Sequence, residues 1–339
     1  MHTADKVQDR RLDELRQWLS RIGGFDTASL RPASGDASFR RYFRLNAGTD
    51  TCVVMDAPPD KEDCKPYVRI AGYLQQMGLH GPRVLEASLE QGFLVLTDLG
   101  SRQYLAELKE RPERGNELYG DALRALATLQ DEGQPMQGQL PPYDEKLLRF
   151  ELRLFHDWLC NRHLGIVLDA ADARDWDRTC DLLVANALAQ PKVFVHRDYH
   201  SRNLMLVDDN NPGILDFQDA VEGPLTYDLV SLLKDCYIRW PADRVRDWAG
   251  AFHRLAPTAS ALEIGEFMRF FELTGVQRQL KAAGIFARLN HRDGKPAYLC
   301  DVPRTLQYII DIAPRYPELS FIADLIAARI LAQLHGPGS

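Results

Sequence analysis

The 339-residue sequence has none of the long apolar runs or paired cysteines that mark membrane proteins and disulfide-stabilised domains. No apolar stretch reaches the roughly 18 residues that a membrane helix needs. The N-terminus shows neither the apolar segment nor the small-residue cleavage site of a signal peptide. The six cysteines are scattered without a C-x-x-C pair, so we expect neither a disulfide framework nor a zinc site. These absences predict a cytoplasmic protein with reduced thiols and no membrane partner.

An excess of positive charge is also absent. The 41 Lys and Arg residues are outnumbered by 48 Asp and Glu residues, which gives a net charge of −7. This balance argues against nucleic acid as a partner and leaves small molecules as the default ligands. A content of 45% hydrophobic and 26% charged residues is typical of a globular protein, and the length accommodates two lobes. A monomer is the simplest expectation.

The first hundred residues predict a small, strand-rich lobe. An amphipathic helix comes first, with Leu15, Trp18 and Leu19 on its apolar face and a Gly-Gly pair at its end. Residues 25–97 then alternate short apolar runs with Gly, Asp and Pro, which is typical of strands. One helix, "KPYVRIAGYLQQMG", is inserted among them.

Helices dominate after a connector at Thr97–Gly100. Only the stretch around 192–217 interrupts them, with the short strands "KVFV", "NLMLV" and "GILDF". Pro241 begins another helix, and three more follow. We therefore expect an α+β fold of two lobes, a small antiparallel N-lobe at residues 1–97 and a larger helical C-lobe at residues 98–339.

The segment "HRDYHSRN" carries the chemistry. Asp198 and Asn203 match the H-R-D-x-x-x-x-N loop of phosphoryl-transfer enzymes, in which a carboxylate accepts the hydrogen bond of the attacking hydroxyl and an amide oxygen helps to hold Mg²⁺. Asp216 follows 18 residues later (216 − 198), before a Phe, as in a D-F-G motif. The alternative is a pair of polar turns between buried strands, and the joint occurrence of both motifs makes it the weaker interpretation.

The chain resembles the aminoglycoside phosphotransferase/choline kinase family of the protein-kinase-like fold. The resemblance lies in "SGDASFRRYFRL" (34–45), "VVMDAPPDKEDC" (53–64), "FLVLTDLG" (93–100), "FVHRDYHSRNLM" (194–205), "ILDFQDAVEGPLTYDLVSLL" (214–233) and "QRQLKAAGIFARL" (277–289). It implies a kinase that uses ATP and Mg²⁺, with Asp198 as the catalytic residue and Asn203 and Asp216 as metal ligands. Within the family the blocks are most similar to bacterial kinases of cell-wall amino sugars. That similarity implies phosphoryl transfer to the anomeric hydroxyl of N-acetylmuramate or N-acetylglucosamine.

The resemblance also places the nucleotide between the lobes. The adenine is expected against the connector, at Thr97, Asp98 and Leu99. The loop over the phosphates is expected at Ser34, Gly35, Asp36, Ala37 and Ser38, where small residues let backbone N–H groups approach oxygen atoms. A plain hairpin turn is the alternative for this loop.

One position departs from the family pattern. Such kinases carry a lysine on the third strand that contacts the phosphates and pairs with a glutamate on the following helix. Met55 stands there, and the helix contains no acidic residue. We expect Arg41 or Arg44 to supply the missing charge, unless both are solvated arginines of the strand. A pseudokinase that binds nucleotide without catalysis is the non-enzyme alternative.

The remaining predictions concern supporting residues. His196 and Asp228 are expected to brace the catalytic loop, although Asp228 also fits an ordinary acidic residue in the first turn of a helix. Arg202 either contacts substrate or braces the loop. Asp235, Gln277 and Arg278 are expected to face the acceptor, Arg278 binding a carboxylate if it points inward. A kinase of aminoglycosides or choline is the alternative enzyme.

Overall fold

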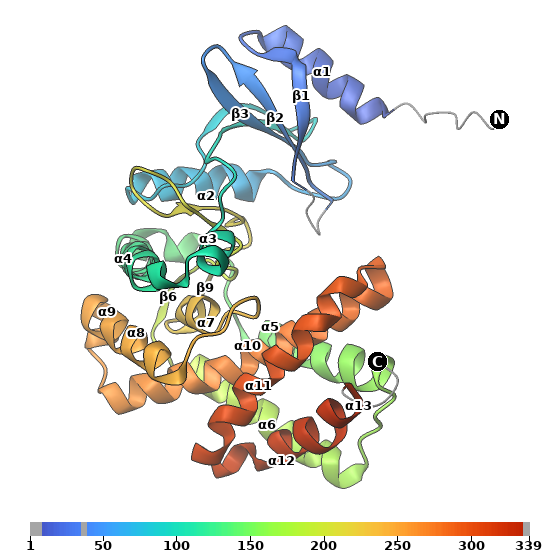
Figure 1. Cartoon of the computed structure of the whole chain (residues 1–339), viewed down its shortest axis with the longest axis vertical. Coiled ribbons are helices and arrows are strands. Elements are labelled where there is room, and N and C mark those ends of the chain that lie inside the picture. Colours follow the sequence, from blue (N-terminus) through green and yellow to red (C-terminus); the bar gives the residue numbers. More distant parts are fainter. Residues whose placement is uncertain (1–8, 35–38, 335–339) are drawn as a thin grey trace, which may run out of the picture. The chain divides into compact units, whose positions relative to one another are not determined.

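The structure is a computed structural model that describes residues 9–34 and 39–334. The chain divides into two compact units, Met1–Ser101 and Arg102–Ser339. An antiparallel sheet dominates the first unit and helices dominate the second (Figure 1). This is the expected α+β class. The assignment of nucleotide binding to residues 1–97 and acceptor binding to residues 98–339 stays a prediction.

The first unit is built on a five-stranded antiparallel sheet with the strand order β1-β2-β3-β5-β4. Its elements are α1 (Arg10–Ile22), β1 (Asp26–Ser34), β2 (Arg41–Ala47), β3 (Asp50–Asp56), α2 (Lys65–Gln76), β4 (Val84–Ser88) and β5 (Phe93–Thr97). In the β2–β3 pair, Tyr42 lies opposite Met55 and Arg44 opposite Val53. Since side chains alternate between the faces of a strand, these four residues share one face of the sheet.

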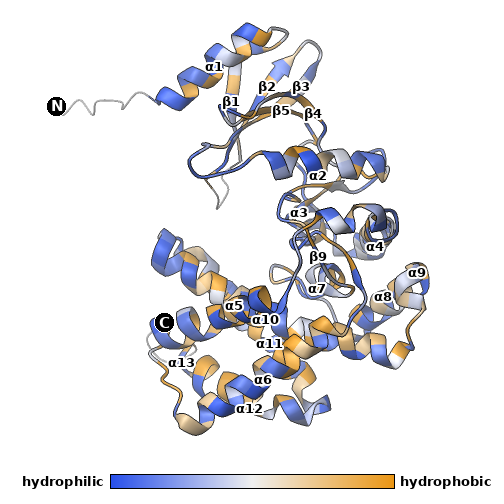
Figure 2. Ribbon diagram, turned by 180° about the vertical axis from the view of Figure 1, so that it is seen from behind, coloured by the Kyte–Doolittle hydropathy of each residue, from blue (hydrophilic) through white to orange (hydrophobic). Residues whose placement is uncertain are grey.

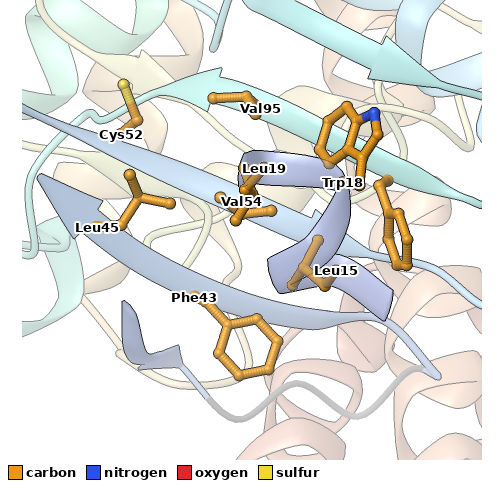
Figure 3. Close-up of a cluster of buried hydrophobic side chains, with 9 residues drawn as sticks. Leu15, Trp18, Leu19, Phe43, Leu45, Cys52, Val54 and Val95 are labelled. Carbon is orange, nitrogen blue, oxygen red and sulfur yellow. The ribbon is translucent and has the colours of Figure 1, made fainter. Parts of the chain in front are cut away.

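Helix α1 covers the other face of this sheet. The cluster joins Leu15, Trp18 and Leu19 of the helix to Phe43, Leu45, Cys52, Val54, Phe93 and Val95 of the strands (Figure 3). Hydrophilic and hydrophobic residues alternate along α1, as expected of a helix with one buried face (Figure 2). Burying each leucine contributes about 1.5–3 kcal/mol. The helix ends as predicted, at Gly23, whose φ of 74° favours a residue without a side chain.

The second unit is mainly helical. Its α-helices are α3 (Tyr104–Glu110), α4 (Gly115–Glu132), α5 (Glu145–Leu154), α6 (Ala170–Leu188), α7 (Tyr227–Leu233), α8 (Ala242–Leu255), α9 (Pro257–Ser260), α10 (Ile264–Asp293), α11 (Val302–Ile312), α12 (Ser320–Asp324) and α13 (Ala332–Leu334). Two π-helices, η3 (Phe155–His163) and η7 (Leu325–Leu331), and the short 3₁₀ segments η1 (Pro112–Arg114), η2 (Gln134–Gln139), η4 (Pro296–Asp301), η5 (Ala313–Arg315) and η6 (Pro317–Leu319) complete it.

Two small antiparallel hairpin-like pairs interrupt these helices. Strand β6 (Lys192–Val195) pairs with β9 (Val221–Pro224), and β7 (Leu204–Met205) pairs with β8 (Gly213–Ile214). The sequence predicted β6, β7 and β8 but not β9. The segment "VEGP" has no apolar alternation and contains Gly and Pro, so only its pairing with a distant strand makes it extended.

Helix α10 is the central packing element of the second unit. It contacts α5, η3, α6, α7 and α11. It lies very close to a neighbouring backbone at Gly284, where an added Cβ would lie 2.3–2.5 Å from backbone atoms of Leu154 and Phe155. Only glycine permits this separation, which sets the depth of the seam between α10 and the α5–η3 segment.

Candidate active site

One buried carboxylate holds the backbone of the catalytic-loop motif after β6. Asp228, in the first turn of α7, accepts hydrogen bonds from the amides of His196 (2.6 Å) and Arg197 (2.9 Å). Arg197 has a φ of 78°, a conformation that costs about 1–2 kcal/mol in a residue with a side chain. The two bonds to Asp228 stabilise this strained turn, which directs the following residue away from the strand.

His196 fixes the loop from the other side. Its Nε2 donates to the carbonyl oxygen of Leu215 (3.0 Å), and its Nδ1 accepts from the backbone amide of Asp198 (3.3 Å). Burial lowers the pKa of this imidazole, so the neutral ring that both bonds require is favoured. His196 and Asp228 thus make the contacts of a brace.

The predicted catalytic residue and the two predicted metal ligands lie together. Asn203 donates through Nδ2 to the backbone carbonyl of Asp198 (3.0 Å) and to Oδ2 of Asp216 (3.2 Å). Gln218 donates to the other oxygen of Asp216 (2.9 Å). Asp216 has a φ of 61°, so it sits at a sharp turn just after β8. The Asp198 side chain is 42% exposed, which leaves its carboxylate accessible to a reactant.

This arrangement fits a magnesium ion. Both hydrogen bonds that join Asn203 to its neighbours use Nδ2, which leaves its carbonyl oxygen for a cation next to the Asp216 carboxylate. No group of three or more His, Cys, Asp or Glu placed to hold a metal occurs within residues 9–34 and 39–334. Mg²⁺ does not require one, because it is bound through one or two carboxylates together with substrate phosphates.

A buried cluster of charged residues lies behind the loop. Glu151 of α5 forms ion pairs with Arg197 (2.6 Å) and with Lys281 of α10 (2.8 Å). The Tyr143 hydroxyl donates to Glu151, and Gln277 Nε2 lies 3.2 Å from both. Glu151 is 2% exposed, so two cations and two polar donors replace its lost hydration.

Two members of this cluster were not assigned a role from the sequence. Glu151 belongs to none of the quoted blocks, and Lys281 lies in the block 277–289 without an assigned role, far from Glu151 along the chain. The signal available was a charged residue at a position of the apolar face, as in "LLRFELRL", where Glu151 follows Leu148 at helical spacing. A buried charge of this kind requires a partner, but the sequence does not say which.

Arg278 points inward and is the cation that approaches Asp198. Its Nη2 lies 3.9 Å from Asp198 Oδ1, and its Nε has no hydrogen-bond partner among the described residues. Burial opposes ionisation of Asp198, but the positive charges of Lys281 and Arg278 outweigh it and lower the pKa of Asp198 to about 2. Asp198 is therefore an anion at neutral pH.

Asp235 is placed differently from the expectation that it faces the acceptor. Its carboxylate is fully buried and accepts from the amide (3.0 Å) and hydroxyl (2.5 Å) of Ser201 and from the amide of Tyr237 (2.8 Å). A buried carboxylate needs such donors: Ser201 of the catalytic loop occupies Oδ2, and the amide of Tyr237 occupies Oδ1. Arg202 lies 4.7 Å from the centre of the Tyr237 ring, in a cation–π contact.

Arg44, in the first unit, is engaged by the connector. It pairs with Asp98 through two hydrogen bonds, Nε to Oδ2 (2.5 Å) and Nη2 to Oδ1 (2.8 Å), and donates to the carbonyl of Gly100 (2.8 Å). Thr51 also donates to Asp98 (2.7 Å). The Asp98 side chain is 6% exposed. Arg44 thus fixes the segment Thr97–Gly100 rather than standing free to meet a phosphate.

Arg41 lies on the face opposite Met55. It pairs with Asp56 (2.9 Å from Nε to Oδ2) and with Asp9, and Arg11 of α1 binds the other oxygen of the buried Asp56 (3.1 Å). Met55 and Asp56 are adjacent in β3, so their side chains point to opposite faces. This position makes Arg41 a poor replacement for the missing lysine. Met55 itself is buried.

The predicted phosphate loop falls mostly outside the described residues. Gly35, Asp36, Ala37 and Ser38 are not described, and Ser34 ends strand β1. The connector residues Thr97, Asp98 and Leu99 follow directly on β5. Their contact with adenine stays a prediction, as do the roles assigned to the other site residues.

These features are those of a kinase-like phosphotransferase, and comparison with known sequences establishes the family. The chain belongs to the phosphotransferase enzyme family, whose profile matches residues 29–299. The N-acetylmuramate/N-acetylglucosamine kinase of Pseudomonas aeruginosa is 48% identical over 335 residues, covering 94% of this chain and 97% of the relative. Its counterpart from Neisseria meningitidis is 42% identical over 315 residues, covering 91% and 92%.

Solved structures show the same fold at low identity. An ADP-bound aminoglycoside phosphotransferase has a TM-score of 0.58 at 18% identity, covering 87% of this chain and 97% of its own. A choline kinase from Streptococcus pneumoniae has a TM-score of 0.59 at 10% identity, with the same coverage. The predicted fold and family are thereby confirmed. In the described part of the chain, no helix is both long and apolar enough to span a membrane.

Proposed function

We propose that this enzyme transfers the γ-phosphoryl group of ATP to the anomeric hydroxyl of N-acetylmuramate or N-acetylglucosamine. The observation that carries the proposal is the half-exposed Asp198 carboxylate, on a loop whose backbone at Asp198 is hydrogen-bonded to Asn203, which also bonds Asp216. The names of the relatives at 42–48% identity support the choice of acceptor. Because ATP is the donor, we place the reaction in the cytoplasm.

The role of Asp198 follows from its charge. With a pKa of about 2, it is a weak base that accepts a hydrogen bond from the acceptor hydroxyl and aims the oxygen at phosphorus. Phosphoryl transfer through a loose transition state needs little proton removal before the new bond forms. Orientation is therefore the main contribution of Asp198, and it accepts the proton late in the reaction.

Asn203 and Asp216 would hold Mg²⁺ through their side-chain oxygens. The ion, when bound, neutralises charge on the phosphates of ATP. Gln218 donates a hydrogen bond to Asp216, and Asp228 accepts one from the backbone of the catalytic loop. These contacts keep the two side chains in place before substrate binds. Such preorganisation reduces the reorganisation that the reaction would otherwise require.

The acceptor is proposed to bind beside Arg278. This guanidinium is buried 3.9 Å from Asp198, and its Nε lacks a partner among the described residues. An arginine with free donors pairs well with a carboxylate such as the lactyl group of N-acetylmuramate. Of the cations near Asp198, Arg197 and Lys281 are already tied to Glu151. Arg278 is therefore the residue proposed to favour an anionic acceptor.

An acceptor panel tests the proposal. Purified enzyme is incubated with labelled ATP, Mg²⁺ and either N-acetylmuramate, N-acetylglucosamine, choline or an aminoglycoside. Phosphorylation of the two amino sugars alone is expected, and Asp198→Asn should lower kcat by about 10²–10⁴-fold while ATP still binds. Turnover of choline or the aminoglycoside in preference to both sugars would refute the acceptor. ATP binding without turnover of any acceptor would favour a pseudokinase.

A further inference from the structure

A basic cavity lies on the seam between α10 and the α5–η3 segment. It measures about 460 Å³, and its lining includes Arg153, Arg288 and Arg292. Arg278, the cation beside Asp198, precedes Arg288 by 10 residues. At 1.5 Å per residue, the two positions are about 15 Å apart along the helix axis. The cavity is therefore separate from the place where an acceptor hydroxyl meets Asp198.

Two contacts hold α10 against the α5–η3 segment along this seam. At one end, Gly284 brings α10 against the backbone of Leu154 and Phe155. At the other end, His163 Nδ1 of η3 lies 3.1 Å from His291 Nε2 of α10. Between these two contacts, the lining joins Arg153, Arg288 and Arg292 to the apolar Phe150, Leu154 and Trp158.

The charges of the cavity are not balanced. Arg153 and Arg288 form no hydrogen bond or salt bridge within residues 9–34 and 39–334, and Nε of Arg288 is buried without a partner. Arg292 pairs with the adjacent Asp293 (2.8 and 2.9 Å). Asp157 is the one acidic residue in the lining, and Asp293 already pairs with Arg292, so three arginines against two aspartates leave a surplus of one positive charge.

This surplus has a free-energy cost that an anion would remove. Burial and the neighbouring charge of Arg292 lower the pKa of Arg288, while Asp293 opposes them, so its guanidinium, although still protonated, is less well stabilised than in water. On a helical wheel, Arg288 and Arg292 lie within about 20° of Lys281, so they belong to the face of α10 that packs on α5. Lys281 has Glu151 as its partner on this face, whereas Arg288 has none.

The lining also contains apolar surface for the body of a ligand. Phe150 is 46% exposed, and Trp158 also lines the cavity. The volume falls in the range of small-molecule sites, which combine apolar walls with a few charged groups that fix orientation. Guanidinium groups recognise phosphate and carboxylate oxygens through paired hydrogen bonds.

We propose that this cavity is a second ligand site, which binds the phosphate or carboxylate group of a small ring-containing molecule between Arg153 and Arg288, with the ring against Phe150 and Trp158. The site goes beyond the proposed phosphoryl transfer and does not depend on it. A sugar phosphate and an acidic sugar share the required chemistry, an oxyanion on a ring with apolar C–H faces. The binding experiment distinguishes a sugar phosphate from an acidic sugar as the ligand.

Binding is measured on the full-length enzyme by tryptophan fluorescence. The contribution of Trp158 is the part of the fluorescence change that the wild type shows and Trp158→Phe lacks. The probes are N-acetylglucosamine 1-phosphate, N-acetylmuramate and, as the neutral control, N-acetylglucosamine. We expect at least one anionic probe to change the Trp158 signal in a saturable way and the neutral sugar to leave it unchanged. The anion that binds more tightly identifies the ligand class.

The variant that tests the arginines is Arg153→Gln/Arg288→Gln. Its affinity for the anionic probe should fall at least tenfold, while kcat with saturating ATP and acceptor stays within twofold of the wild type. Arg178→Gln, a change at an exposed arginine of α6 paired with Asp175, is the control and should bind the probe normally. Circular dichroism shows whether each variant is folded.

Several results would overturn the site. These are equal binding of charged and neutral probes, no Trp158 signal with any probe, undiminished affinity in the double variant, or a tenfold fall in its kcat. The last outcome would place the arginines in the acceptor site instead. Failure of the proposed sugar kinase activity appears separately, as absent turnover in the wild type, and leaves the binding measurement interpretable.

Discussion

Arg278 Nη2 lies 3.9 Å from Oδ1 of Asp198, and the two residues come from a helix and a loop that are 80 positions apart (278 − 198) in the sequence. The pair is not a closed salt bridge of normal hydrogen-bond length. The guanidinium has room to bind another anion while its charge keeps Asp198 ionised. Arg278 is therefore placed both to bind an anionic acceptor and to keep the carboxylate of Asp198 ionised.

Arg278→Gln should discriminate between the two amino sugars. Loss of a charge-assisted hydrogen bond costs about 1.5–3 kcal/mol, so KM for N-acetylmuramate should rise roughly 10–150-fold. KM for N-acetylglucosamine, which has no carboxylate, should change much less. Steady-state kinetics with both sugars measure the ratio.

Arg269→Gln is the matched control for this change. Arg269 is on the same helix but exposed, where it pairs with Glu318 (3.2 Å), so both KM values should stay near those of the wild type. An equal rise in KM for both sugars in Arg278→Gln would contradict carboxylate recognition by this residue.

Glu151→Gln should destabilise the second unit. Removing this buried charge leaves Arg197 and Lys281 without their shared partner, and breaking a buried pair costs about 3–5 kcal/mol. Denaturant unfolding measures the loss. Glu145→Gln, an exposed change on the same helix where Glu145 pairs with Arg149, should cost less than about 1 kcal/mol. Similar losses in both variants would argue against the buried network.

The Arg44–Asp98 pair should control affinity for nucleotide. Arg44→Gln releases two hydrogen bonds that fix the connector, so KM for ATP should rise about tenfold. Asp98→Asn should have a similar effect, and the double variant should be little worse than either single one, because both remove the same interaction. Fully additive effects would show that the two residues act independently.

Arg41→Gln should behave differently from Arg44→Gln. Arg41 shares the buried Asp56 with Arg11, on the sheet face that α1 covers, so its loss should lower thermal stability more than affinity for ATP. Thermal unfolding and ATP titration of the same preparation separate the two effects. A large rise in KM for ATP with unchanged Tm would restore Arg41 as the substitute for the missing lysine.

The carboxyl group of Asp228, which holds the catalytic loop, should titrate in mildly acidic solution. Burial raises the pKa of Asp228 from 3.8 to about 6, although the hydrogen bonds from the amides of His196 and Arg197 favour its ionised form. Because this pKa is raised on folding, the contribution of Asp228 to stability is present below about pH 4 and is lost as pH rises to about 6. Two pKa units correspond to about 3 kcal/mol. Only the ionised form accepts both loop amides fully, so kcat should decline below about pH 6.

The pH dependence of kcat in wild type and Asp228→Asn checks this assignment. The variant cannot change charge, so it should have lower activity overall and no decline centred near pH 6. Persistence of the same acidic limb in Asp228→Asn would assign it to another group.

Gly284→Ala should be strongly destabilising. The new methyl group would meet backbone atoms of Leu154 and Phe155 at 2.3–2.5 Å, and overpacking of this kind costs about 1–3 kcal/mol or more. Gly265→Ala, on the same helix with nothing within 4 Å, should instead gain up to about 1 kcal/mol from helix propensity. Equal effects at the two positions would contradict the close approach of α10 to the α5–η3 segment.

The fold class and the residues of the catalytic loop could be predicted from the amino-acid sequence. Strand and helix periodicity marks the N-lobe sheet and α1, because one buried face imposes a local repeat on apolar residues. Asp198, Asn203 and Asp216 are recognisable because the loop geometry requires a fixed spacing between them. Strand β9 was missed, since its extended form depends on pairing with β6 and not on its own residues.

The tertiary structure alone decided which charged residues face one another. Arg44 and Asp98, or Glu151 and Lys281, are far apart in the chain, and no periodicity relates them. The sequence left Arg278 open between solvent and site, and packing of α10 turned it inward. It suggested Asp235 for the acceptor, whereas Ser201 and the amide of Tyr237 occupy both of its oxygens in the folded chain. Which buried charges pair with one another depends on their separation and on their loss of hydration. Both are set only when the chain folds.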